Sequence, residues 1–451
     1  MTIRFTAARV VRAGMLGMAL SATWLLPGPL AASSNQDLAP SAFELTPTQL
    51  ESAAGAALAS EYAAFTENLE SDPATAAMHA EAAAKLAADQ FGSAAPEYAT
   101  ALANQGLAEQ VAGRLDRAVL AYEEAIQVIQ ANEGENSVAQ VAVANALAET
   151  LMARGDRRDA TKLQERTFLL QKAYYGDDSP QLVDALYTRA RWAERTSTAE
   201  SAARAYQRIV SIVGEHYGEF ETDLIEPLMA FAFVSLDRET GKFARTPRSI
   251  QMEADRAAAR AVRIARSTAD TDPALLARTL VRQGDWMQFI GLRRRGQQAY
   301  REAWAMMSEN PGLTELRAEL FTTPTSIYAA PLRRVYNASR EGTFDERDFP
   351  REGFVEVRYD INPRGRPVNI RIIDGYPAGL LDAHIVRQIR GSLYRPEYRD
   401  GKPVRQRNLT LRHTFSYDDT RFSDSERAFI ERVASERVGK RDDDESGSNG
   451  G

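Results

Sequence analysis

The chain has 451 residues, a formal net charge of −7 at pH 7 and no cysteine. This length allows two or three domains, and an apolar share of 44% is sufficient to build hydrophobic cores, so a chain that is disordered throughout is excluded. Without cysteine the chain has no disulfides, no thiolate metal site and no cysteine nucleophile. The mild acidity gives no reason to expect nucleic-acid binding.

Residues 1–33 have the pattern of an export signal, with a basic start, an apolar run and small residues at a cleavage site. The basic residues are Arg4, Arg9 and Arg12. The uncharged run from Ala13 to Leu26 ends at a Pro-Gly-Pro sequence, and we expect cleavage near Ala32, followed by a linker over 34–50. The wider uncharged stretch Ala13–Gln36 is also long enough to span a membrane as an uncleaved anchor. The pattern favours cleavage, but both readings stay open.

Residues 51–309 contain an internal repeat of 42 residues. Three series keep this spacing: Gly92, Gly134, Gly176 and Gly218; Ala76, Ala118, Ala160 and Ala202; and Ala80, Tyr122, Gln164 and Tyr206. A glycine that closes each unit suits the end of a helix, where the backbone takes a positive φ. The recurring alanines would let two antiparallel helices approach closely. Because one helix hairpin cannot bury its apolar face alone, the pattern predicts stacked hairpins, an all-α solenoid.

The repeat resembles the tetratricopeptide repeat (TPR), in the longer form found in kinesin light chains. The residues that carry the resemblance are Gly113 to Ala118, Tyr122 to Ile126 and, in the third unit, Gly176 to Pro180. The period weakens after Gly218, with an insertion near 240–249. A related spacing returns at Gly291, Gly296, Tyr300 and Ala303. The resemblance implies a groove that binds protein segments, and the alternative is a spacer or a platform for oligomerisation.

Composition shifts after about residue 310, where alanine-rich helices give way to proline, arginine and β-branched residues. We expect a linker over 310–344, with a short helix around 328–339. Alternating patterns then predict three strands, over 354–361, 368–372 and 408–417. A helix is predicted over 380–389, with Leu381, Ile385 and Ile389 on one face. The order strand, strand, helix, strand predicts a small α+β domain over 345–417, followed by a polar tail over 418–451 that is disordered at its end.

The predicted domain resembles the C-terminal domain of TonB, the periplasmic energy transducer of Gram-negative bacteria. Five pieces carry the resemblance: Gly353-Phe354-Val355, Arg364-Gly365-Arg366-Pro367-Val368, Leu381-Asp382-Ala383, Tyr394-Arg395-Pro396 and Asp400-Gly401-Lys402-Pro403-Val404. The family's long spacer rich in proline and lysine is replaced here by helical repeats, and the apolar N-terminal run lacks the histidine of the transducer anchor. In the family, the third strand can pair with a short segment of an outer-membrane receptor.

The resemblance implies that the third strand binds a partner by strand addition, because main-chain hydrogen bonds supply the affinity. The candidate partner-binding residues are Asn408, Leu409, Thr410, Leu411, Arg412, His413 and Thr414. Alternation places Leu409, Leu411 and His413 on one face of this strand. The opposite face then carries Thr410, Arg412 and Thr414.

The sequence contains no phosphate-binding glycine loop, nucleophile elbow or metalloprotease helix. The four histidines fall on different predicted elements: His79, His216, His384 and His413. We therefore expect no catalytic, cofactor-binding or metal-ligating residue, no cofactor and no small-molecule substrate. Residues 351–417 contain thirteen basic and seven acidic side chains, which suits docking onto the acidic repeats, binding to anionic envelope material, or a merely solvated surface.

Together these patterns predict a multidomain protein, with an all-α TPR-like solenoid followed by a β-β-α-β domain. The function that they favour is a non-enzymatic interaction scaffold in the periplasm, whose partners are other cell-envelope proteins, an outer-membrane receptor among the candidates. The alternative is a TonB-type energy transducer that keeps its N-terminal segment as an inner-membrane anchor. The oligomeric state is not predicted.

Overall fold

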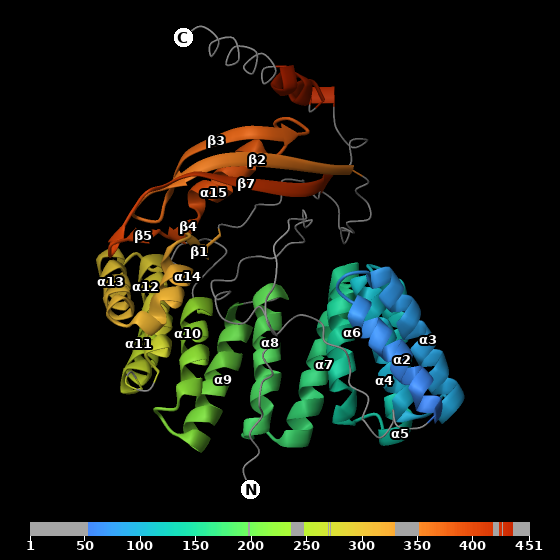
Figure 1. Ribbon diagram of the computed structural model, residues 1–451. Coiled ribbons are helices and arrows are strands. Elements are labelled where there is room, and N and C mark those ends of the chain that lie inside the picture. Colours follow the sequence, from blue (N-terminus) through green and yellow to red (C-terminus); the bar gives the residue numbers. More distant parts are fainter. Residues whose placement is uncertain are drawn as a thin grey trace.

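A computed structural model (Figure 1) describes residues 53–196, 199–235, 248–268, 270, 272–329, 351–417, 424–425 and 427–435. The predicted export signal and the linker over 34–50 lie outside the described residues. The end of the polar tail also lies outside them. No helix of the described part is long and apolar enough to cross a bilayer.

Residues 53–321 form a row of antiparallel helix hairpins, apart from the undescribed residues between them (Figure 1). The helices are α2 (Ala53–Asn68), α3 (Pro73–Phe91), α4 (Pro96–Val111), α5 (Leu115–Glu133), α6 (Val141–Arg154), α7 (Arg157–Tyr175), α8 (Val183–Thr196), α9 (Ala199–Tyr217), α10 (Ile225–Val234), α11 (Arg248–Ser267), α12 (Pro273–Phe289), α13 (Arg293–Glu309) and α14 (Thr314–Phe321). Short 3-10 turns lead into several first helices, at Val138–Gln140, Pro180–Leu182 and Thr222–Leu224. Helices α3, α5, α7 and α9 begin at equivalent positions of the 42-residue repeat.

The structure explains the recurring residues physically. The alanine series occupies fully buried sites, since Ala76, Ala118, Ala160 and Ala202 are all 0% exposed. The glycine series ends α3, α5, α7 and α9 with φ values of 94°, 92°, 89° and 111°. This region of φ is costly for residues with a Cβ atom, so the chain reverses there at glycine. The predicted helical solenoid is therefore confirmed.

Two glycines that the sequence analysis did not single out allow the closest helix contacts. A Cβ atom on Gly106 would lie 2.7 Å from the ring of Tyr122, and one on Gly284 would lie 2.4 Å from the ring of Tyr300. Each tyrosine is 0% exposed and packs onto the backbone of the first helix of its hairpin. Gly296, which the sequence analysis identified by its spacing alone, also approaches the backbone of α12 closely.

The irregular part of the solenoid follows α10, whose residues Ile225 and Pro227–Val234 are all buried. The predicted insertion near 240–249 falls mostly outside the described residues. Helices α11 to α13 continue the stack, and α14 extends it beyond the expected limit at 309. The short helix expected around 328–339 is not seen where it can be checked, because Tyr328 ends strand β1 (Thr325–Tyr328). The segment pairs with a later strand, and residues 330–350 lie outside the described residues.

The C-terminal domain contains the predicted order of strand, strand, helix, strand. Strands β2 (Arg351–Ile361), β3 (Pro367–Tyr376) and β7 (Gln406–Tyr417) form an antiparallel sheet in the order β3-β2-β7, and α15 (Asp382–Gly391) packs on it. The core between helix and sheet includes Val355, Val357, Ile385 and Ile389. Three short strands were not predicted: β4 (Leu393–Arg395), β5 (Tyr398–Arg399) and β6 (Lys402–Pro403).

Part of the polar tail is folded. Residues 427–435 are helical, and this segment lies at the far side of the C-terminal domain in Figure 1. A Cβ atom on Gly379 would lie 2.9 Å from the ring of Phe429 and 3.2 Å from Val433. The tail helix therefore packs against the loop that precedes α15. The expected disorder at the chain end concerns residues outside the described ones.

Candidate partner-binding edge and domain junction

The predicted partner-binding residues lie on an edge strand. β7 pairs with β2 in antiparallel register, with Leu409 opposite Tyr359 and His413 opposite Val355. Within the described ranges no strand pairs with the other side of β7. Its outward backbone groups are therefore placed where an added strand could bind them.

Side chains alternate across β7 as the sequence predicts. Leu409 packs against the core under α15, with Phe415 and Tyr417 farther along the same face. Leu411 lies in the same alternation, opposite the buried Val357, yet it is 38% exposed because it lies near the open edge. His413 is half-buried on this face, and burial lowers the pKa of its imidazole because the charged form loses solvation.

On the opposite face of β7, Arg412 contacts side chains of the neighbouring strand β2. The Arg412 guanidinium lies 3.7 Å from the centroid of the Phe354 ring and 3.7 Å from Glu356 Oε2. Thr410 lies opposite Arg358, and Thr414 lies opposite Phe354. Arg412 therefore helps to hold β7 on β2, a role that the sequence analysis did not assign to it.

The first candidate residue is exposed, but its backbone N–H is already bonded within the domain. Asn408 adopts φ 59° at an irregularity in β7, and its backbone N–H donates to Asp360 Oδ1 at 3.0 Å. The other Asp360 oxygen accepts from Asn369 Nδ2 at 2.7 Å. The hydrogen bonds from Asn408 and Asn369 lower the pKa of Asp360. Because the Asn408 N–H is used within the domain, an added strand would have to bind the backbone from Leu409 onward.

A second site, which the sequence did not reveal, joins the two domains. Strand β4 pairs with β1 in antiparallel register, with Thr325 opposite Arg395. Arg395 Nη1 lies 3.5 Å from Asp285 Oδ2 on α12, and Tyr300 on α13 donates to Asp285 Oδ1 at 2.6 Å. Burial raises the pKa of Asp285, although Arg395 and Tyr300 oppose this shift.

Aromatic packing surrounds this ion pair. The ring of Tyr398 lies 5.0 Å from that of Phe321, 5.7 Å from that of Tyr300 and 6.3 Å from that of Trp304. Residues Leu393 and Tyr398 belong to the same buried cluster as the last solenoid helices. The excess of basic residues over 351–417 predicted charge-driven docking onto the acidic repeats as one of three alternatives. In the described part, the junction instead combines one ion pair with aromatic burial.

Two histidines of the solenoid make polar contacts with neighbouring residues. His79 contacts Glu61 at 2.7 Å, and His216 lies 2.8 Å from the carbonyl oxygen of Asp178. No group of three or more histidine, aspartate or glutamate side chains within the described ranges is arranged to hold a metal ion.

These features define a helical-repeat protein with a small α+β domain fixed to its last repeat. Residues 347–416 match the family described as Gram-negative bacterial TonB protein C-terminal, which confirms the resemblance drawn from the sequence. No curated protein matches the chain.

Solved structures of low similarity include a putative kinesin light chain from Podosopora anserina with nearly identical TPR-like repeats. It is 17% identical, covers 48% of this chain and 98% of its own, and has a TM-score of 0.39. A second structure of these repeats, with one residue substituted, is 15% identical, with 48% and 96% covered and a TM-score of 0.38. BtubC from P. vanneervenii is 14% identical, with 65% and 100% covered and a TM-score of 0.39. The solenoid assignment itself rests on the helices and periodicity of this chain.

Proposed function

We propose that the protein is a non-enzymatic interaction scaffold in the periplasm of a Gram-negative cell. The observation that carries the proposal is the placement of β7, an edge strand in a domain that is clamped to a repeat solenoid. A partner segment adds to β7 through main-chain hydrogen bonds, and the solenoid offers a separate surface to a second envelope protein. The match of residues 347–416 to the TonB family supports an envelope location.

Proline and alanine substitutions in β7 test strand addition. Successive N–H groups of a strand point to opposite sides in the plane of the sheet, so Thr410→Pro and Leu411→Pro remove donors from different sides. One of these variants breaks the ladder to β2 and destabilises the domain. The other leaves the fold intact and removes an outward donor. Thr410→Ala and Leu411→Ala are the matched controls, because they change the side chain and keep the N–H.

The measurement is recovery of envelope proteins on the immobilised full chain, after circular dichroism has identified the proline variant that still folds. We expect that variant to lose the partners that both alanine variants retain. Retention of every partner by a folded proline variant would rule out strand addition at this edge.

The alternative function, an energy transducer anchored in the inner membrane, is supported by the same TonB match and by the uncharged stretch Ala13–Gln36. Mass spectrometry of the N-terminus of the native protein separates the two. A chain that begins near Ser33 in the soluble periplasmic fraction supports the scaffold. A full-length chain confined to membranes supports the transducer.

A further inference from the structure

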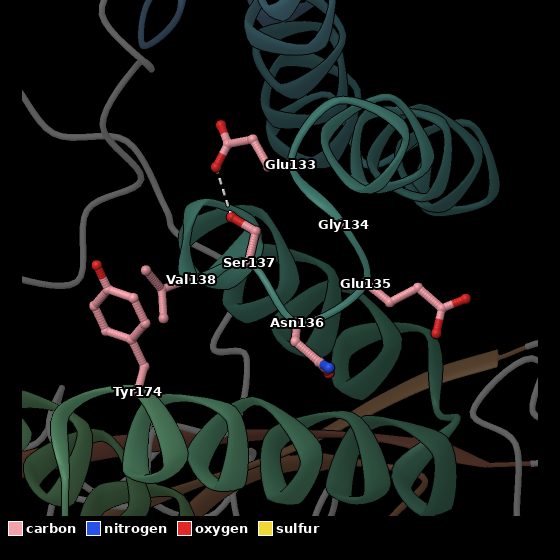
Figure 2. Close-up of a pocket in the computed structure, with 7 residues that line it drawn as sticks. All are labelled: Glu133, Gly134, Glu135, Asn136, Ser137, Val138 and Tyr174. Atoms are coloured by element: carbon pink, nitrogen blue, oxygen red, sulfur yellow. Dashed lines mark hydrogen bonds between the residues drawn. The ribbon is translucent and has the colours of Figure 1, made fainter.

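Two loops of the solenoid gather charge of one sign. The α5–α6 loop lines a surface pocket of about 480 Å³ with Glu133 and Glu135. Figure 2 shows that these side chains diverge, because Glu133 bonds Ser137 and Glu135 points away from Tyr174. The turn between α12 and α13 instead leads into three consecutive exposed arginines, Arg293 to Arg295. This arginine turn lies at the junction with the C-terminal domain, where a further cation meets it.

The further cation is Arg366, a half-buried residue at the end of the turn between β2 and β3. The turn is fixed from within, because Asn362 Oδ1 accepts from the backbone N–H groups of Arg364 at 2.9 Å and Arg366 at 3.1 Å. It is also tied to β4, because the Tyr394 N–H donates to the carbonyl oxygen of Gly365 at 2.9 Å. Arg366 is therefore positioned by the strand that pairs with β1 at the solenoid.

No counter-charge accompanies Arg366. Its Nη1 donates to the carbonyl oxygen of Ser392 at 3.4 Å, and in the described part of the chain no carboxylate forms an ion pair with it or with Arg293. Burial lowers the pKa of Arg366, and the charge of Arg293 across the junction lowers it further. A half-buried cation without an anion is unfavourable, and a neighbouring cation adds to that cost. An anion from outside the chain would stabilise both groups.

We propose that Arg293 and Arg366 together bind the phosphate group of an anionic ligand, between the solenoid and the C-terminal domain. Each guanidinium donates parallel hydrogen bonds to the ion. A phosphate group has more acceptor oxygens and more charge than a carboxylate, so it suits two guanidinium groups better. The exposed Arg294, Arg295 and Arg364 raise the positive potential around the site.

The bound phosphate contacts both domains, so it adds a second link to the Asp285–Arg395 ion pair. Its source is either a phosphorylated lipid headgroup or a soluble phosphate compound of the envelope. The inference goes beyond the proposed scaffold function, and it does not involve the β7 edge. Its outcome is therefore independent of the test of strand addition.

The test is isothermal titration calorimetry of the full chain with pyrophosphate at constant ionic strength. We expect binding to the wild type, and we expect Arg293→Gln and Arg366→Gln each to weaken it about tenfold or more, because each removes charge-assisted hydrogen bonds. The matched control is Arg371→Gln, which removes the same charge from an exposed residue of β3, about 16 Å farther along the strand. This control should leave the affinity unchanged.

Thermal melting separates a binding role from a structural one. In phosphate-free buffer, Arg293→Gln should melt no lower than the wild type, because it removes a like charge beside Arg366. With saturating pyrophosphate the wild type should gain stability and Arg293→Gln should not. Sedimentation with phosphatidylglycerol vesicles then identifies the source. Vesicle binding that Arg293→Gln abolishes supports a lipid headgroup, and pyrophosphate binding without vesicle binding supports a soluble phosphate compound.

Three results would overturn the proposal. They are no binding of pyrophosphate to the wild type up to millimolar concentration, equal affinities of the wild type and Arg293→Gln, and an equal loss of affinity in Arg371→Gln. Arg293 is exposed, so its variant keeps the test decisive even where Arg366→Gln fails to fold.

Discussion

Replacement of Arg395 by methionine tests how the buried ion pair holds the two domains together. Arg395 is 3% exposed and Asp285 is 7% exposed, so the variant leaves a buried carboxylate without its cation. Loss of one partner from a buried pair costs about 3–5 kcal/mol. Against a typical stability of about 5–15 kcal/mol for a folded domain, this is a large fraction. The loss falls at the junction, so we expect the C-terminal domain to detach before the distant repeats unfold.

The loss of stability in Arg395→Met should depend on pH, because it arises from the charge on Asp285. Burial raises the pKa of Asp285 above its ordinary value of 3.8, and Arg395 is the main group that opposes the shift. A carboxyl group with a raised pKa favours the folded state in its protonated form, so its contribution falls as the pH rises through the folded-state pKa. Without Arg395 this pKa rises further. The deficit of Arg395→Met relative to the wild type should therefore shrink as the pH is lowered from neutral towards the carboxyl range.

A second substitution separates charge from packing. Asp285→Asn keeps an oxygen for the Tyr300 hydroxyl and removes the charge, so Arg395→Met combined with Asp285→Asn should be more stable than Arg395→Met alone. The assay is urea unfolding followed by tryptophan fluorescence, because Trp304 lies 6.3 Å from the Tyr398 ring in the junction. The opposite outcome is that the double variant loses, at every pH, as much free energy of unfolding as the two single variants lose together. In that case the unpaired charge is not the cause of the destabilisation.

Three further substitutions test the helix packing and the hydrogen bonds of Asp360. Ala118→Trp overfills a site that is 0% exposed and should cost typically about 1–3 kcal/mol or more, so a melting curve by circular dichroism that matches the wild type would show the packing face to be wrong. Gly106→Ala should also lower the melting temperature, because the new Cβ would lie 2.7 Å from the Tyr122 ring, whereas the control Gly214→Ala, with 3.9 Å of clearance, should raise it slightly. Asp360→Asn should cost about 1 kcal/mol at neutral pH, and the difference should close as the pH falls through the lowered pKa of Asp360, as measured by urea unfolding at several pH values.

The repeat could be predicted because its evidence is local and recurrent. Ala118 and Gly134 belong to series that return every 42 residues, and each series reports one physical need, a close contact or a positive φ. The strands of the C-terminal sheet could also be predicted, because β2, β3 and β7 span 11, 10 and 12 residues and each is long enough to contain a recognisable alternating stretch.

The junction could not be predicted from such patterns. Strand β4 spans 3 residues and β5 and β6 span 2 each, which is too short for alternation to be recognised. Asp285 and Arg395 form one contact between distant parts of the sequence, and no periodicity links them. The hydrogen bond of the Asn408 N–H is a similar case. An asparagine tolerates positive φ, but only the position of Asp360 on the neighbouring strand shows that its N–H is used there.

The junction also determines how the candidate edge can act. Strand β7 begins at Gln406, soon after β6 ends at Pro403, and the preceding strands β4 and β5 carry Leu393 and Tyr398, which pack on the solenoid. Rotation of the β3-β2-β7 sheet relative to the repeats would therefore break the β1–β4 pairing, the Asp285–Arg395 ion pair or the packing of Tyr398. A partner segment added to β7 would be held at a fixed position relative to the solenoid. This geometry suits simultaneous binding of two partners, and it differs from a transducer whose C-terminal domain moves on a long flexible spacer.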